Sequence, residues 1–215
     1  MSDPTKAARN LPPGSILWDH SGFSLAEFIV ASLILIVVSA ALFTLLGGTQ
    51  RTASYQTEVQ AVMANARVAM DTVERILRQA GNDPLNTGFD GVAITGSTEV
   101  RIRTDLTGSA GGSNPDKGDP DGDTNDSGED LTIRYNSTAK TLEVVPGGGS
   151  AQTIAAYITA FTLQYYDATG ATTSTGANVK RINISISGSS TLPNPQTGQT
   201  FSIQLTSDVQ LATRQ

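Results

Sequence analysis

The sequence GFSLAE, residues 22–27, leads into apolar sequence that continues without a break to Leu46. From Phe23 to Leu46 there are 24 residues, and Glu27 is the only charged one. At about 1.5 Å of rise per residue, a helix of this length spans roughly 36 Å, which exceeds the ~30 Å hydrocarbon core of a bilayer. The stretch therefore predicts a membrane-spanning helix that begins close to Phe23.

Glu27 is a costly residue in a membrane unless it has a partner. An ionised carboxylate in a spanning helix costs roughly 2.5–3.5 kcal/mol on insertion scales. Cleavage after Gly22 would supply a partner, because the new α-amino group of Phe23 would lie one helical turn from Glu27. The same amine could instead meet the glutamate of a neighbouring copy.

Gly22, Phe23, Leu25 and Glu27, with the apolar run after them, resemble the class III signal of type IV prepilins and type II secretion pseudopilins. In that family a membrane-embedded aspartic peptidase cuts a short leader between glycine and phenylalanine, the new N-terminus is methylated, and the fifth mature residue is glutamate. The resemblance implies cleavage and N-methylation at Gly22 and Phe23. It also implies that Glu27 guides assembly by meeting the Phe23 amine of an adjacent subunit.

The resemblance further implies three parts. Residues 1–22 would be a cleaved leader, residues 23–48 a transmembrane or filament-core helix, and residues 49–215 an amphipathic helix with a β-rich head. The alternative is an ordinary signal anchor with an incidental glutamate. A cleaved secretory signal is disfavoured, because no small-x-small cleavage site follows the apolar core at residues 46–49.

Composition excludes several function classes. The chain has no cysteine, and its single histidine, His20, lies in the predicted leader. The mature chain would therefore lack Ser-His-Asp and Cys-His catalysis as well as thiolate-bound and histidine-bound metals. We expect no enzyme. The net charge of −6, without a basic cluster, argues against nucleic-acid binding.

A second helical pattern follows the apolar run. Apolar residues recur at spacings of three and four from Tyr55 to Ala80, and Gly81 with Pro84 is a stop signal. One helix from about Phe23 to Ala80 is therefore expected. The pair Gly47 and Gly48 has two readings: local flexibility that costs up to about 1 kcal/mol per glycine, or a point where the helix stretches on entering a filament.

Alternating apolar and polar residues after residue 82 predict strands, and a helix followed by antiparallel strands is an α+β order. The motifs at residues 78–81 (RQAG) and 130–135 (DLTIRY) resemble the PilW group of minor pilins, and J-type pseudopilins share the layout. The implied fold is type IV pilin-like, with the long helix packed on an antiparallel sheet. The expected strands contain Val100 and Ile102, Leu131 to Tyr135, Leu142 and Val144, Ile154 to Tyr165, Ile182 to Ile186, and Phe201 to Leu205.

Residues 107–130 form an acidic segment with seven acidic side chains against Lys117 alone, a net charge of −6. Oxygen ligands stand at positions 1, 3, 5, 7 and 12 of an EF-hand-type calcium loop, although Thr124 replaces the usual glycine and the last ligand is aspartate. These ligands are Asp119, Asp121, Asp123, Asn125 and Asp130. Calcium is the one candidate cofactor, and none is required. The alternative is a solvated acidic loop.

We therefore expect a minor pilin of a type IV pilus, a structural subunit that helps initiate assembly and enters the filament. Its implied partners are the prepilin peptidase, other minor and major pilins, and the inner-membrane assembly platform. Before assembly it would sit in the inner membrane with a periplasmic head, and afterwards in the pilus at the cell surface. The alternatives are a J-type pseudopilin of a type II secretion system and a membrane-anchored calcium-binding or adhesive module that never polymerises.

Overall fold

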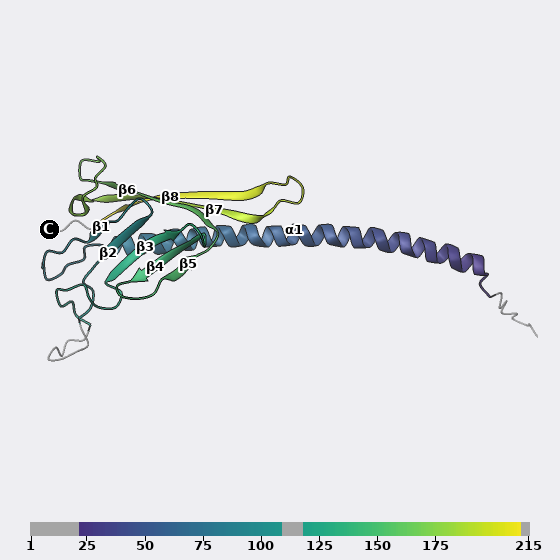
Figure 1. The fold of residues 1–215 in the computed structure, drawn as a ribbon, viewed down its shortest axis with the longest axis horizontal. Coiled ribbons are helices and arrows are strands. Elements are labelled where there is room, and N and C mark those ends of the chain that lie inside the picture. Colours follow the sequence, from purple (N-terminus) through teal and green to yellow (C-terminus); the bar gives the residue numbers. More distant parts are fainter. Residues whose placement is uncertain (1–21, 109–117, 212–215) are drawn as a thin grey trace, which may run out of the picture. The chain divides into compact units, whose positions relative to one another are not determined.

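A computed structural model describes residues 22–108 and 118–211 (Figure 1). It contains one long helix, α1 (Leu25–Gln79), followed by antiparallel strands and a short 3-10 helix, η1 (Gly176–Asn178). The α+β order and the long apolar amino-terminal helix are thus confirmed. Residues up to Gly47 and residues from Gly48 form two units.

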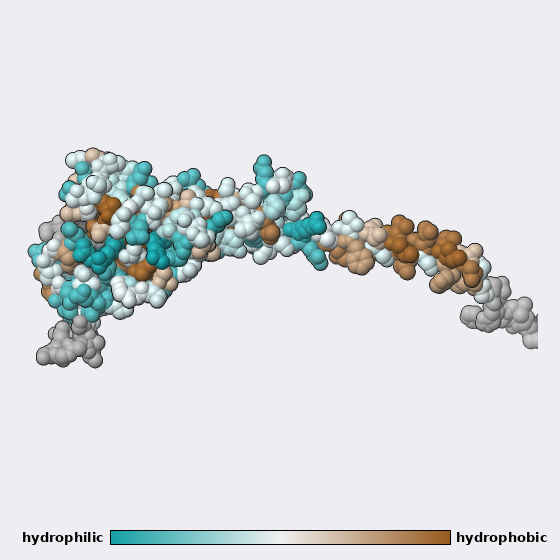
Figure 2. All heavy atoms as spheres, in the orientation of Figure 1, coloured by the Kyte–Doolittle hydropathy of each residue, from teal (hydrophilic) through white to brown (hydrophobic). Residues whose placement is uncertain are grey.

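The first unit is the apolar part of α1. Its large apolar side chains are exposed, including Phe28 and Phe43, which are 69% and 74% accessible. On the face that Figure 2 shows, apolar residues cover most of this helical segment. By length and composition, α1 could cross a membrane. A helix that is apolar on every side needs lipid or partner helices around it.

In the second unit, α1 becomes amphipathic and ends where the stop signal predicts. The helix continues through Gly47 and Gly48 and ends at Gln79. Gly81 then adopts a left-handed φ of 73°, and its N–H donates to the carbonyl of Arg103 at 2.9 Å. Glycine favours this conformation because it has no Cβ to clash. The last turn is thereby tied to the strands.

The strands form two sheets. The five-stranded sheet has the order β1-β2-β3-β4-β5, and the three-stranded sheet has the order β6-β7-β8; all pairs are antiparallel. The strand bounds are β1 Val92–Ile94, β2 Glu99–Arg103, β3 Asp130–Asn136, β4 Thr141–Pro146, β5 Gln152–Ala155, β6 Ile158–Tyr166, β7 Arg181–Pro193 and β8 Thr200–Gln210.

One hydrophobic core joins α1 to both sheets. The predicted helical stripe is buried, with Ala66, Ala69 and Val73 fully inaccessible. Ala69 and Val73 share a cluster with buried residues of both sheets, such as Ile133 in β3 and Ile184 in β7. Buried residues alternate with more exposed ones along β2 and most of β7, as expected for a sheet with one face in the core.

The chain changes sheets where the sequence predicts one strand from Ile154 to Tyr165. That prediction was wrong in one respect: β5 ends at Ala155, and β6 begins at Ile158 in the other sheet. Tyr157 adopts a φ of 62°, and the side-chain oxygen of Asn65 in α1 accepts a hydrogen bond from the Ala156 N–H at 3.1 Å. The corner breaks the strand although the apolar pattern continues. The three-residue strand β1 was also missed.

Candidate functional site

The first candidate site is the start of α1. Gly22 and Phe23 precede the helix and are exposed. The Ser24 N–H donates to Glu27 Oε2 at 2.8 Å, and the Glu27 N–H donates to Ser24 Oγ at 3.2 Å. These reciprocal bonds form a capping box, which satisfies two helix-end donors.

The capping box gives Glu27 a local role that was not predicted from the sequence. The signal was available, since Ser-x-x-Glu before an apolar run is its usual pattern. Phe23 and Glu27 also line one shallow surface hollow with the apolar residues Val30 and Ile34. The helix start therefore presents a carboxylate within an otherwise apolar surface. Residues 1–21 of the predicted leader lie outside the described residues.

The second candidate site is the acidic segment, of which residues 109–117 lie outside the described residues. Carboxylate oxygens of Asp121, Asp123 and Asp126 lie within 4.8 Å of one another. Asp123 accepts a hydrogen bond from the Asn125 N–H at 2.8 Å, and the Asp123 N–H donates to Asp121 at 3.2 Å. The structure thus brings together two of the predicted ligands with one aspartate that the calcium-loop spacing did not include.

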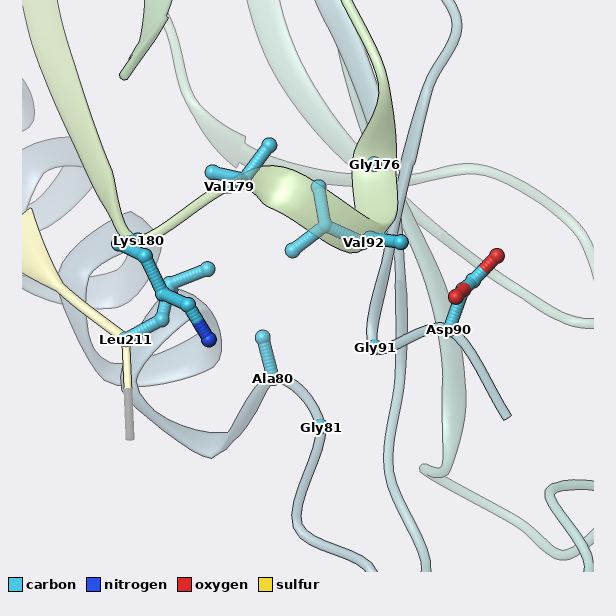
Figure 3. A pocket seen from close by; sticks show the side chains of 10 residues that line it. Ala80, Gly81, Asp90, Gly91, Val92, Gly176, Val179, Lys180 and Leu211 are labelled. Atoms are coloured by element: carbon cyan, nitrogen blue, oxygen red, sulfur yellow. The ribbon is translucent and has the colours of Figure 1, made fainter. Parts of the chain in front are cut away.

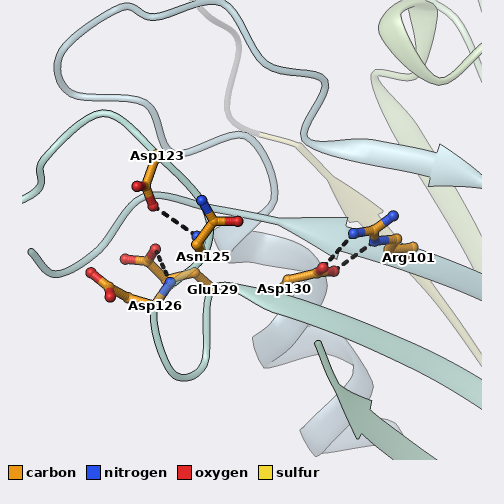
Figure 4. A network of polar contacts seen from close by, with 6 residues as sticks. All are labelled: Arg101, Asp123, Asn125, Asp126, Glu129 and Asp130. Atoms are coloured by element: carbon orange, nitrogen blue, oxygen red, sulfur yellow. Dashed lines mark hydrogen bonds and ion pairs between the residues drawn. The ribbon is translucent and has the colours of Figure 1, made fainter. Parts of the chain in front are cut away.

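Asp130 and Asp119 lie apart from this group. Asp130 begins β3, and its carboxylate accepts hydrogen bonds from the Nε and a terminal nitrogen of Arg101 in β2, the first at 2.7 Å. Figure 4 shows Asp130 turned toward Arg101 and away from Asp123 and Asp126. Asp119 is exposed and does not belong to the group of close carboxylates among the described residues.

Two buried carboxylates lie beside the group. Asp105, just after β2, is 0% exposed, and its Oδ2 accepts a hydrogen bond from the Gly122 N–H at 3.0 Å. Its Oδ1 is buried and has no hydrogen-bond partner among the described residues. Burial raises the pKa of Asp105, and the nearby carboxylates of Glu129 and Asp121 raise it further against the lowering effect of the Gly122 hydrogen bond.

Glu129, the second buried carboxylate, holds the two ends of the acidic segment together. Its Oε1 accepts hydrogen bonds from the backbone N–H groups of Leu106 at 2.7 Å and Thr107 at 2.8 Å. Its Oε2 accepts one from the Asp126 N–H at 3.3 Å (Figure 4). Neither Asp105 nor Glu129 was predicted, because nothing in their local sequence marks them as buried.

A small pocket lies among the end of α1, β1, η1 and the chain after β8 (Figure 3). Its volume is about 90 Å³, whereas pockets for small ligands have roughly 300–1,000 Å³. In Figure 3 the Lys180 side chain extends toward the space, while the Asp90 carboxylate points away from it. A Cβ on Gly91 would collide with the backbone of Gly81. We regard this pocket as a packing seam.

No protein-family model matches the chain, and a search of curated proteins found no match. Function is therefore inferred from the residues themselves and from how the fold arranges them.

Proposed function

We propose that this chain is a minor pilin, a structural subunit that helps initiate assembly of a type IV pilus and is incorporated into it. One observation carries the proposal: Gly22, Phe23 and Glu27 stand at fixed offsets before an exposed, unbroken apolar helix. The amphipathic second half of that helix, packed on antiparallel sheets, supports the same reading.

The arrangement supports a simple mechanism of assembly. The prepilin peptidase would remove residues 1–22, and the apolar helix would hold the subunit in the inner membrane with its head in the periplasm. Docking against other pilins at the assembly platform would cover the exposed apolar helix. There the α-amino group of one subunit's Phe23 would neutralise Glu27 of its neighbour, which matters most where water is excluded.

Other functions fit some of these features. A J-type pseudopilin of a type II secretion system would use the same helix and the same glutamate in a shorter assembly. A membrane anchor that never polymerises would need neither cleavage at Gly22 nor a charge at Glu27. We propose no catalytic activity, because the chain lacks cysteine and the mature chain would lack histidine.

The test separates the charge of Glu27 from its capping role. A capping box accepts glutamine as well as glutamate, so Glu27→Gln keeps the cap and removes the charge. The control, Ser24→Ala, removes the capping hydroxyl and keeps the charge. Incorporation is measured by immunoblotting filaments sheared from cells, relative to the processed protein left in the membrane.

We expect Glu27→Gln to be processed but incorporated roughly tenfold less or worse, because breaking a buried ion pair costs about 3–5 kcal/mol. Ser24→Ala should be incorporated close to the wild-type level. Normal incorporation of Glu27→Gln would contradict the proposed role of the charge. A loss confined to Ser24→Ala would show that only the cap matters.

A further inference from the structure

The acidic segment contains a compact group of oxygen donors. Oxygens of Asp121, Asp123 and Asp126 lie within 4.8 Å of one another. Calcium binds six to eight oxygens at about 2.3–2.6 Å, so ligands on opposite sides of the ion are roughly 4.6–5.2 Å apart. The spread of these three carboxylates fits around one such ion. Exposed acidic groups alone do not establish a site, however, and a second observation is needed.

Asp105 provides that second observation. It comes from a different part of the chain, is fully buried, and is held against the loop by the hydrogen bond from the Gly122 N–H, between Asp121 and Asp123. Its other oxygen, Oδ1, is buried without a hydrogen-bond partner among the described residues. A buried ionised oxygen without a partner is costly, so such groups are normally paired or bound to a metal.

In the part of the chain that the structure describes, basic side chains do not pair with the two buried carboxylates. Within residues 22–108 and 118–211, no lysine or arginine lies within 4.0 Å of a carboxylate oxygen of Asp105 or Glu129. Arg101, in the neighbouring strand, pairs with Asp130 instead. Glu129 is already saturated by backbone N–H groups on both flanks of the segment. These hydrogen bonds hold Leu106 and Thr107, which follow Asp105, close to Asp126.

We propose that Asp105, Asp121, Asp123 and Asp126 form a calcium-binding site between the end of β2 and the loop that precedes β3. All four ligands are carboxylates, and hard oxygen donors select a hard cation. Magnesium is disfavoured, because it demands a tighter octahedral site and dehydrates reluctantly. The bound ion would neutralise the buried Asp105 and fasten the loop to the sheet.

The ligand set differs from the one that the calcium-loop spacing predicts. That spacing makes Asp119 the first ligand and Asp130 the last, whereas the structure places both outside the group of close carboxylates. Asp105 is not a member of that group either, and we add it because its buried carboxylate accepts a hydrogen bond from the Gly122 N–H of the same loop. Asp119 is exposed, as is Asp123, so substitution of either is compatible with folding. Asp119→Asn is therefore a matched control for Asp123→Asn.

The experiment uses the full chain, purified in detergent and stripped with a chelator. Calcium chloride binding is measured by titration calorimetry, and the melting temperature is measured in calcium and in chelator. The variants are Asp105→Asn, Asp123→Asn and the control Asp119→Asn; magnesium chloride is titrated in parallel.

The wild type should bind one calcium ion per chain and melt at a higher temperature in calcium. Asp105→Asn and Asp123→Asn should each weaken binding by roughly tenfold or more, since even the hydrogen-bond partners of metal ligands are worth about tenfold to a hundredfold. Asp119→Asn should bind as the wild type does. Asp105→Asn should melt no lower than the wild type in chelator, because it removes an uncompensated buried charge.

Three results would overturn the proposal: no calcium-dependent heat or melting shift in the wild type, wild-type affinity in Asp123→Asn, or magnesium binding as tight as calcium. Loss of binding in Asp119→Asn would overturn this ligand set in favour of the linear spacing. If Asp105→Asn fails to fold, Asp123→Asn decides, because its side chain is exposed.

Discussion

The carboxylate of Glu58 in α1 accepts hydrogen bonds from both the backbone N–H and the hydroxyl of Thr191 in β7, at 2.9 and 2.5 Å. The Leu192 N–H donates to the same carboxylate at 2.8 Å. Pairing between β7 and β8 is interrupted between Ser189 and Pro193. Glu58 therefore accepts hydrogen bonds from two backbone N–H groups that lie where β7 does not pair with β8. These bonds hold the β7–β8 hairpin against α1.

Removing this carboxylate should destabilise the head. Glu58→Ala leaves two backbone donors at a partly buried position without their acceptor, which costs about 1–3 kcal/mol. Chemical denaturation of the detergent-solubilised protein, followed by circular dichroism, measures the change. Asp71→Ala is the control, because Asp71 is exposed on the same helix and should change stability by less than about 0.5 kcal/mol. Equal effects of the two substitutions would contradict this account.

The same contact predicts a pH dependence. Burial acts to raise the pKa of Glu58, but the hydrogen bonds from Thr191 and Leu192 outweigh it and hold the pKa below its usual value of 4.5. Because the folded-state pKa lies below that of the unfolded chain, the stabilisation is complete above the unfolded-state pKa and is lost as the pH falls through the folded-state pKa.

Melting temperatures of the wild type and Glu58→Gln, measured from neutral to acidic pH, test this dependence. The difference between them should be constant at neutral pH and should shrink once the pH falls below about 4.5. A difference that persists unchanged into strong acid would show that the charge of Glu58 contributes nothing.

The seam at the end of α1 makes a steric prediction. A Cβ on Gly91 would collide with backbone atoms of Gly81, which cannot move aside as a flexible side chain would. Gly91→Ala should therefore destabilise the head by about 1–3 kcal/mol, the usual cost of overpacking. Gly96→Ala is the control, because a Cβ there meets nothing within 4 Å. Similar melting temperatures for the two variants would refute the close approach.

The sequence predicts the elements whose patterns are local. The apolar run and the three-and-four spacing predict α1, and Gly81 predicts its end, because each signal is confined to a few neighbouring residues. Alternation likewise predicts most strands. The corner at Ala156 and Tyr157 escaped prediction, because apolar residues continue through it and only packing against Asn65 reveals the change of sheet.

The candidate calcium ligands show the other limit. Asp121 and Asp123 are predictable because they are close in sequence. Asp105 stands 16 residues before Asp121 and is brought to the loop only by the strand pairing of β2 with β3 and by the bonds of Glu129. Asp130 fits the linear spacing, but Arg101 on the neighbouring strand holds it elsewhere. Contacts of this kind depend on tertiary structure.

The most direct test of the pilin assignment is the amino terminus of the protein in its assembled form. Intact-mass and peptide mass spectrometry of protein recovered from sheared filaments should find a chain that begins at Phe23 and carries an N-methyl group. Gly22→Ala should remain in the membrane as the full-length precursor, whereas the control Gly47→Ala should be processed normally. Assembled filaments that retain residues 1–22 would contradict the assignment.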